Sequence, residues 1–282
     1  MSDREARAAE EAAAAGAAMG ERALLKGKRG LIVGVANDHS IAWGIAKVLA
    51  AHGADLAFTY QGEGFGKRVR PLAESMGSEI VMPVDVTDAG SLDALFARIG
   101  EEWGRLDILV HAIAYSDKAE LDGRFVDTSR ANFLTSLDIS CYSLVDLTRR
   151  AEPLMTEGGS VVTLTYLGAQ RVTPNYNVMG VAKAALESSV RYLANDLGPK
   201  GIRVNAISAG PMRTLAGAAI AGARKVYKTG ETNAPLRTNG TLEAVGGTAL
   251  WLASDYGACT TGEVIFVDGG FHVLGMPQGE NL

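Results

Sequence analysis

The apolar residues of this chain follow two alternating patterns from Gly30 onward. Short, nearly continuous apolar runs predict strands, and the longer segments between them carry helical patterns. The predicted strands are residues 30–35, 55–60, 79–84, 107–112, 160–165, 202–207 and 263–268. The predicted helices are residues 41–52, 64–76, 88–103, 131–154, 175–197 and 241–254. Apolar strands separated by helices are typical of a parallel sheet covered on both faces. The pattern therefore predicts an α/β fold, a single-domain Rossmann-like doubly wound parallel sheet of about seven strands.

One connection is too long for this alternation. Residues 211–240 follow the sixth predicted strand and are rich in Ala and Gly, where a short βα turn would be enough. They could be an ordinary surface insertion or a lid over a bound ligand. In doubly wound sheets the ligand lies beyond the carboxyl ends of the strands, and this segment begins there. Its position therefore favours a helical substrate lid.

The first 25 residues differ from the rest of the chain. They are rich in Ala and in charges of both signs, and they contain no apolar segment of the signal-peptide type. Nothing in them offers a large apolar face to bury. We expect residues 1–25 to be a disordered extension or a frayed helix, dispensable for the domain of residues 26–282.

Composition narrows the possible classes of function. The formal net charge of −5 argues against nucleic acid or an anionic membrane surface as the main partner. No apolar run reaches the roughly 18 residues that a membrane helix needs. The 2 cysteines lack any motif spacing and the 4 histidines lack ligand spacing. We therefore expect a cytoplasmic protein without disulfides and without a metal site.

The turn after the first predicted strand offers a place for a pyrophosphate. Gly34 can form the tight turn, Ser40 can cap the next helix, and Gly44 lies in its first turn. The backbone amides of Ser40 and Ile41 would then face an anion at the positive end of the helix. The segment lacks the G-x-G-x-x-G fingerprint, so a generic strand–loop–helix junction is the alternative. Its place after the first strand favours the pyrophosphate.

The residue that ends the second strand bears on the choice of nicotinamide cofactor. Gln61 is neutral, so it can bond a ribose 2′-hydroxyl without repelling a 2′-phosphate. Lys67 and Arg68 lie a turn or two further on and could meet such a phosphate, or they could be solvated surface residues. The sequence favours NADH over NADPH.

The ends of the third and fourth strands would line the rest of a cofactor site. Asp85 and Val86 close the third strand, where a carboxylate could accept a hydrogen bond from the adenine amine or cap the following helix. Small residues near Ile113 would let the backbone approach the cofactor ribose.

Tyr176 and Lys183 open a predicted helix just after the fifth strand. A spacing of seven returns them to one helix face, about 10 Å apart along the axis. A nearby ammonium would lower the pKa of the phenol from its ordinary value near 10 and strengthen it as an acid. The alternative is a helix that packs Tyr176 and exposes Lys183. Two neighbours distinguish this segment from common ketoreductases, which place Tyr four residues before Lys: that position holds Met179, and a second tyrosine, Tyr166, precedes it.

These motifs resemble the NADH-dependent enoyl-acyl-carrier-protein reductases of bacterial and plastid type II fatty-acid synthesis, a divergent branch of the short-chain dehydrogenases. The resemblance runs from about Lys26 to Gln278. It rests on the segments GVANDHSIAWGIA, LAFTYQ, YLGAQRVTPNYNVMGVAKAALE, VNAISAGPMRTLA and VDGGF. The Tyr-x6-Lys spacing with PNYNVMG is specific to this family, whereas the glycine pattern is shared with relatives.

The resemblance implies a role for each matching residue. Tyr176 would bond the thioester carbonyl oxygen and stabilise the enolate that forms on hydride addition, and Lys183 would bind the nicotinamide ribose. Tyr166 would line the acyl site together with Ala114, Tyr115 and Ser116. Further cofactor contacts would come from Met212, Thr214, Leu215 and Ala216, where the lid begins. The segment 218–223 is unusually small and lacks an aromatic residue, which leaves chain-length preference open.

The family also implies an acyl-carrier protein as the partner that presents the enoyl chain, and a homotetramer built through the predicted helices 131–154 and 175–197. Two other functions stay open. A carbonyl reductase of the same fold would need a tyrosine where Met179 stands. A cofactor-binding sensor would have no use for Tyr166, Tyr176 and Lys183 together.

Overall fold

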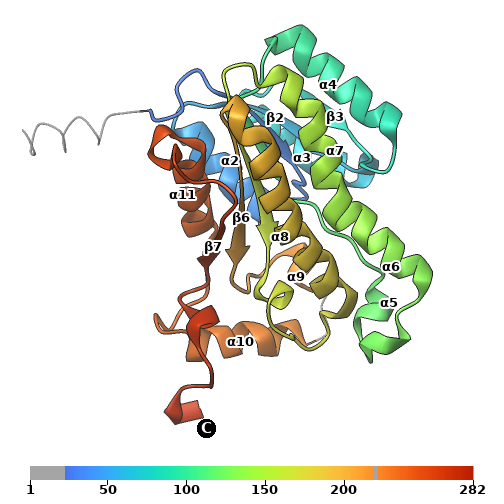
Figure 1. Cartoon of the computed structure of the whole chain (residues 1–282), viewed down its shortest axis with the longest axis vertical. Coiled ribbons are helices and arrows are strands. Elements are labelled where there is room, and N and C mark those ends of the chain that lie inside the picture. The colour runs from blue at the N-terminus through green and yellow to red at the C-terminus, as the bar shows by residue number, and fades with distance from the viewer. Residues whose placement is uncertain (1–22, 219–221, 282) are drawn as a thin grey trace, which may run out of the picture.

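The computed structural model describes residues 23–218 and 222–281, which fold around one seven-stranded parallel sheet (Figure 1). The strands are β1 (Arg29–Val33), β2 (Asp55–Tyr60), β3 (Val81–Pro83), β4 (Ile108–His111), β5 (Gly159–Thr165), β6 (Ile202–Ala209) and β7 (Val264–Val267). Their order in the sheet is β3-β2-β1-β4-β5-β6-β7. The chain reverses direction across the sheet between β1 and β4, which is the switch point where doubly wound folds bind ligands. All seven strands and the Rossmann-like fold predicted from the sequence are confirmed.

Helices cover both faces of the sheet, as Figure 1 shows for α2 and α11 on one side and α7 and α8 on the other. The main helices are α2 (Ile41–Ala51), α3 (Gly62–Glu74), α4 (Ala89–Trp103), α6 (Arg130–Leu137), α7 (Ser143–Ala151), α8 (Asn177–Leu197) and α11 (Leu242–Ala253). Two cores result because each face of the sheet buries its own set of apolar side chains. One is closed by α4, α7 and α8, and the other by α2, α3 and α11.

The predicted helix over residues 131–154 is interrupted. A π-helical segment, Asp138–Tyr142, joins α6 to α7, and a 3-10 turn, Glu152–Leu154, ends the run. Inside the π segment, the Ser140 hydroxyl accepts from the Tyr115 amide at 2.9 Å and donates to the Tyr115 carbonyl at 3.0 Å. Such single-turn π segments are frequent at functional sites. This one fixes the loop that follows β4.

The connection predicted as a lid contains two helices, α9 (Leu215–Ala218) and α10 (Ala223–Asn233). The short helix α5 (Lys118–Leu121), which sequence periodicity did not predict, lies in the loop after β4. Other single turns of 3-10 helix are Phe125–Asp127, Leu167–Ala169, Gly198–Lys200, Asp255–Gly257, Phe271–Val273 and Gly279–Asn281.

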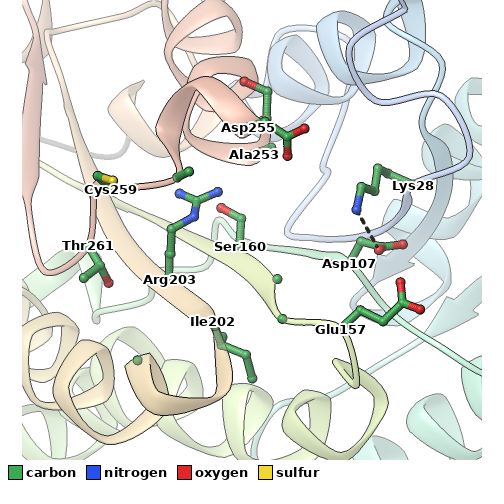
Figure 2. Close-up of a pocket in the computed structure, with 16 residues that line it drawn as sticks. Lys28, Asp107, Glu157, Ser160, Ile202, Arg203, Ala253, Asp255, Cys259 and Thr261 are labelled. Atoms are coloured by element: carbon green, nitrogen blue, oxygen red, sulfur yellow. Dashed lines mark hydrogen bonds and ion pairs between the residues drawn. The ribbon is translucent and has the colours of Figure 1, made fainter.

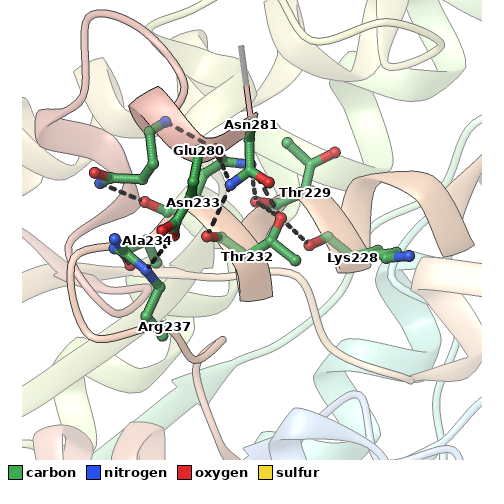
Figure 3. A network of polar contacts seen from close by, with 9 residues as sticks. Lys228, Thr229, Thr232, Asn233, Ala234, Arg237, Glu280 and Asn281 are labelled. Carbon is green, nitrogen blue, oxygen red and sulfur yellow. Dashed lines mark hydrogen bonds and ion pairs between the residues drawn. The ribbon is translucent and has the colours of Figure 1, made fainter.

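The C-terminal segment is bonded to the end of α10 (Figure 3). Buried Asn233 accepts from the Gln278 amide at 2.9 Å and from the Asn281 side chain at 3.1 Å, and its carbonyl accepts from the Gln278 side chain. Arg237 pairs with Glu280 at 3.3 Å. Residues 278–281 therefore hold the C-terminal end of α10 and the residues that follow it within the predicted lid.

The predicted N-terminal extension lies mostly outside the described residues. Of its last residues, Leu25 is fully buried in the core closed by α2, and Leu24 packs against the same core. The Leu25 amide also donates to the His52 carbonyl. The folded domain thus begins before residue 26, slightly earlier than predicted.

Candidate functional site

A cavity of about 1040 Å³ runs along the carboxyl ends of the strands, from the end of β2 to the start of α8. It brings together most of the residues predicted to bind cofactor and substrate. Those that line it are Gly34, Ser40, Ile41, Gln61, Val86, Ile113, Ala114, Tyr115, Ser116, Tyr166, Tyr176, Lys183, Met212, Thr214 and Leu215. The size suits a dinucleotide together with the reacting end of a substrate.

One predicted cofactor residue, Asp85, is absent from the described lining of the cavity, although its neighbours Val84 and Val86 belong to it. The Asp85 carboxylate accepts from the amide and hydroxyl of Thr87 at 2.9 and 2.7 Å, and these bonds lower the pKa of Asp85. It does not cap the next helix either, because Asp88 holds the N-cap of α4 and accepts from Gly90. The backbone of Ala216 lies in α9 between the lining residues Leu215 and Gly217, and its side chain lies outside the part of the chain that the structure describes.

The first turn of α2 presents free backbone amides to the cavity, although not from every residue that the sequence suggested. Ser40 is the N-cap, but its hydroxyl donates to the Asn37 carbonyl at 2.6 Å and makes no cap bond. The Ser40 amide also bonds Asn37, at 3.2 Å, so it is engaged within the loop. The amides of Ile41 and Ala42 thus begin a helix whose N-terminus no side chain caps, and both residues line the cavity.

The two glycines of this motif have different roles. Gly34 has φ +110°, and a Cβ there would lie 2.2 Å from the Ala112 carbonyl, so only glycine lets β1 turn beside the end of β4. Gly44 faces away from the cofactor turn, since a Cβ there would lie 2.7 Å from the Leu242 Cβ. Gly44 is therefore required for the contact between α2 and α11, not for binding phosphate.

The end of the cavity beside β2 is lined by Tyr60, Gln61 and Phe65. Arg70 lies over the Tyr60 ring with 4.9 Å to the centroid and pairs with Glu63 through two bonds of 2.9 and 3.0 Å. The pairing raises the pKa of Arg70 and lowers that of Glu63. Lys67 and Arg68 are exposed and do not line the cavity, which agrees with their interpretation as solvated residues.

Tyr176 lies at the N-terminus of α8 and is buried, 7% exposed. Burial raises its pKa well above the ordinary value, and the charges of Tyr166 and Glu187 act in the same direction. The net shift is thus opposite to the lowering expected from a nearby ammonium, because desolvation of the phenolate is its largest cause. The hydroxyl stays protonated at neutral pH, which makes it a hydrogen-bond donor.

The strand-end tyrosine Tyr166 packs edge-on against Tyr176, with ring centroids 5.1 Å apart. It lies between the end of β5 and the 3-10 turn Leu167–Ala169. Burial raises the pKa of Tyr166 as well. The backbone around Tyr176 is unusual, since Asn175 and Asn177 have φ of +60° and +38°, and such values outside glycine cluster at functional sites.

Lys183 is buried, 5% exposed, and donates to the Leu164 carbonyl at 2.8 Å. Desolvation lowers its pKa to about 8, although Cys141 and Glu187 act to raise it. Behind it, at the end of β4, the His111 ring is fully buried between the hydroxyls of Thr163 and Ser143, each at 2.8 Å. Burial, followed by the charge of Lys183, lowers the pKa of His111 to about 3, so it is neutral.

Several lining residues were not predicted as site residues. Met179 lines the cavity one turn beyond Tyr176, and Leu121 of α5 and the pair Val226 and Tyr227 of α10 also line it. The adjacent apolar pair in a polar stretch is the signal that could have identified α10. Tyr227 supplies an aromatic ring to the lid just beyond the segment 218–223, and Arg213 stacks on it at 4.7 Å from the centroid.

A second cavity, of about 380 Å³, lies at the opposite end of the sheet, where β5 and β6 begin (Figure 2). It is lined by charged side chains, among them Lys28, Asp107 and Arg203, and Lys28 pairs with Asp107 at 3.4 Å. The amino ends of parallel strands are not where doubly wound folds place their ligands. Within the described residues, no group of three or more His, Cys, Asp and Glu side chains could hold a metal ion. None of the described helices is both long and apolar enough to cross a membrane.

Known proteins resemble this chain over nearly its whole length. The family model described as enoyl-(acyl carrier protein) reductase matches residues 34–272. The chain is 59% identical over 259 residues to enoyl-(acyl-carrier-protein) reductase (NADH) 2 of Rhizobium meliloti. The aligned residues cover 92% of this chain and 97% of the relative.

Solved structures agree with the sequence relatives. The enoyl-(acyl-carrier-protein) reductase of Anaplasma phagocytophilum, in complex with NAD, is 57% identical with a TM-score of 0.87, covering 91% of this chain and 96% of that one. FabI of Candidatus Liberibacter asiaticus is 54% identical with a TM-score of 0.89, covering 90% and 99%. The resemblance seen in the sequence motifs is thus confirmed, and the chain belongs to the NADH-dependent enoyl-acyl-carrier-protein reductase family.

Proposed function

We propose that this chain reduces the C2=C3 double bond of trans-2-enoyl thioesters with NADH, on chains carried by acyl-carrier protein, in the last step of the fatty-acid elongation cycle. The observation that supports this most strongly is the group formed by Tyr166, Tyr176 and Lys183. The three side chains line one cavity, with Tyr166 packed on Tyr176 and Lys183 two turns along α8.

The residues of the cavity fit a nicotinamide dinucleotide. An uncapped helix N-terminus suits the pyrophosphate, and a neutral Gln61 with Glu63 beside it suits a ribose without a 2′-phosphate. When bound, NADH supplies a hydride, which adds to the β-carbon of the enoyl thioester. Lys183 would bind the ribose hydroxyls, and Met212, Thr214 and Leu215 would close over the cofactor from the lid side.

Tyr176 is suited to stabilise the charge that develops on the thioester carbonyl oxygen. Its raised pKa keeps the hydroxyl protonated, so it can donate a hydrogen bond to that oxygen as the enolate forms. Tyr166, half-buried against it, limits where the acyl chain can lie. The α-carbon of the enolate then takes a proton from solvent water, which gives the saturated thioester.

Met179 argues against carbonyl reduction in the same cavity. It lines the cavity four residues before Lys183, and its thioether has no proton to give to an alkoxide. Reduction of a 3-oxoacyl thioester needs such a donor, whereas conjugate reduction needs only that the enolate oxygen be stabilised.

The surface of α10 supports a carrier-bound substrate. Val226 and Tyr227 face the cavity, while Arg224, Lys225 and Lys228 are exposed on the same helix. The phosphopantetheine arm that carries an acyl chain ends in a phosphodiester, whose negative charge such a basic face attracts. We infer that acyl-carrier protein docks here and that residues 211–240 act as the substrate lid.

The exposed faces of the long helices support a homotetramer. Leu134 of α6, Tyr142 of the π segment and Tyr192 of α8 each expose more than half of their side chains, and these three elements pack against one another. Exposed apolar residues gathered on neighbouring elements are typical of an interaction surface. We propose that these helices form subunit interfaces and that the enzyme works in the cytoplasm. Light scattering in solution measures the mass of the assembly.

The reaction is tested by following NADH oxidation with a crotonyl thioester. Wild-type protein should oxidise NADH, and Tyr176→Phe should lower kcat by about 10²–10³ because one preorganised donor to the oxyanion is lost. NADH affinity should change little. If Tyr176→Phe turned over the enoyl thioester at the wild-type rate, the assignment of Tyr176 would be wrong; NADH binding without any wild-type turnover would favour a sensor.

A further inference from the structure

Glu187 is a buried carboxylate for which the reaction described above has no use. It lies on α8 one turn beyond Lys183 and is 5% exposed. One of its oxygens accepts from the Thr165 hydroxyl at 2.8 Å, and the other accepts from the Gln170 side chain at 2.9 Å. Burying a carboxylate is costly unless it is well bonded, and an apolar residue of similar size would stabilise the helix at least as well. Stability alone therefore does not explain a carboxylate at this position.

The two donors stand on either side of Tyr166. Thr165 ends β5, and Gln170 follows the 3-10 turn Leu167–Ala169. Glu187 thus joins both ends of the short turn, residues 165–170, to the helix that carries Tyr176 and Lys183. A single hydrogen bond would allow the turn to pivot, whereas two bonds at its two ends fix its position and its orientation.

The turn has almost no freedom to move without displacing Tyr176. A Cβ on Gly168 would lie 2.4 Å from Cδ1 of the Tyr176 ring, so the backbone of the turn lies directly on that ring. A Cβ on Gly180 would lie 2.8 Å from the Gly168 carbonyl, so the turn also lies directly on α8. A shift of the turn therefore moves both tyrosines of the site.

We propose that Glu187 is a positioning residue for the reductase reaction: its carboxylate holds the turn of residues 165–170 on α8 and thereby keeps Tyr166 and Tyr176 in their mutual geometry. The inference rests on the proposed function, because the two tyrosines matter only if they act on the substrate. Misplacement of a reacting group by about 1 Å can cost on the order of 10² in rate, so bonds remote from the substrate can control kcat.

The charge of Glu187 acts on the same site. It raises the pKa of Lys183 against the larger effect of burial, and it raises that of Tyr176. The other groups around Lys183 are Cys141 from the π segment, which also raises its pKa, and the neutral ring of His111 at the end of β4. Removing the charge at position 187 should therefore lower the pH above which Lys183 becomes neutral.

Three substitutions separate positioning from simple stabilisation. Glu187→Gln removes the charge and keeps the shape, Thr165→Val removes one donor at constant shape, and Gln170→Met removes the other donor at a more exposed position. Asp196→Asn is the control, because Asp196 is an exposed acid on the same helix. Each variant is compared with wild type in kcat, in KM for NADH and for a crotonyl thioester, in Tm, and in the dependence of NADH affinity on pH.

If Glu187 positions the turn, Glu187→Gln should lower kcat about tenfold and leave KM for NADH within about twofold at pH 7. Thr165→Val and Gln170→Met should lower kcat by smaller factors. The double variant Glu187→Gln with Thr165→Val should be no slower than Glu187→Gln alone, because the two substitutions remove the same interaction. The alkaline loss of NADH affinity should move to lower pH in Glu187→Gln alone. Asp196→Asn should match wild type throughout.

Results that contradict the role of Glu187 differ from results that contradict the proposed function. If the three variants lowered Tm while the folded protein kept the wild-type kcat and the wild-type pH profile, Glu187 would be a structural residue only and the inference would be wrong. Should Glu187→Gln fail to fold, Gln170→Met still decides the matter, since its site is exposed. Absence of turnover by wild-type protein would instead overturn the proposed function and not the role of Glu187 within it.

Discussion

At the scale of single residues, Lys183 shows how the site was built at the expense of stability. Its ammonium is 5% exposed, and burial lowers its pKa from 10.5 to about 8. At pH 7 the charged form therefore costs the folded state on the order of 3 kcal/mol. The bond to the Leu164 carbonyl returns about 1–2 kcal/mol of this.

We therefore expect Lys183→Met to be more stable than wild type by about 1–2 kcal/mol at pH 7 while NADH affinity and turnover are lost. Urea unfolding measures the first effect and NADH titration the second. The folded pKa lies below the unfolded pKa, so wild type gains stability as pH rises from about 8 to 10.5. The difference between the two proteins should shrink over that range; a constant difference would show that the charge of Lys183 is not its cause.

The sequence predicted which residues line the cavity better than it predicted the pKa shifts of those residues. The spacing of Tyr176 and Lys183 on one helix face follows from helix geometry alone, and both line the cavity. The sign of the pKa shift of Tyr176 was not predictable, because it depends on how completely side chains distant in sequence bury the ring. The bonds of Asp85 to Thr87 were not predictable for a related reason, since they form in a local turn whose geometry the strand pattern does not contain, and its contact with the adenine amine stays a prediction.

At the scale of elements, the contact between α2 and α11 depends on two glycines. A Cβ on Gly246 of α11 would lie 2.5 Å from Val48 Cγ2 and 3.0 Å from the Gly44 carbonyl. We expect Gly246→Ala to destabilise the protein by about 1–3 kcal/mol, because the two helices must separate to admit the methyl group. KM for NADH should also rise, since α2 begins at the predicted pyrophosphate site.

The same helix offers a matched control in Gly247, where an added Cβ would meet nothing within 4 Å. Gly247→Ala should stabilise the protein by about 0.5–1 kcal/mol through helix propensity alone. Thermal unfolding and NADH titration of both variants decide the question. Equal effects of the two substitutions would mean that the helix contact does not limit stability or cofactor binding.

Elements with strong periodicity were predictable and interruptions were not. The apolar runs gave all seven strands, and β2 has the predicted limits, because buried parallel strands are apolar along their length. The helix over residues 131–154 keeps its periodicity through the π segment, so the break is invisible in the pattern. It coincides with a tertiary contact, the bonding of Ser140 to the backbone of Tyr115, which the helical pattern does not contain.

At the scale of the whole molecule, His111 links the stability of the fold to pH. Its ring is fully buried where β4, β5 and α7 meet, between the Thr163 and Ser143 hydroxyls. The Ser143 hydroxyl donates to the Ile139 carbonyl at 2.6 Å, so it accepts from the ring, and the neutral imidazole satisfies both neighbours. Protonation would bury a charge beside Lys183, which is why the pKa of His111 falls to about 3.

The free energy of unfolding depends on pH because His111 has different pKa values in the folded and unfolded states. The unfolded chain binds a proton at His111 below about pH 6.5, whereas the folded chain does so only near pH 3, so stability is complete above 6.5 and falls as pH decreases through that interval. Between pH 8 and pH 5 this one group should remove about 2 kcal/mol from the free energy of unfolding. His111→Gln, which is neutral at every pH, should have a flatter dependence by that amount when both proteins are unfolded in urea at the two pH values. Parallel profiles of the two proteins would show that another group causes the loss of stability in acid. An NMR titration of the wild-type imidazole, which we expect to stay neutral down to pH 5, would test His111 directly even if the variant did not fold.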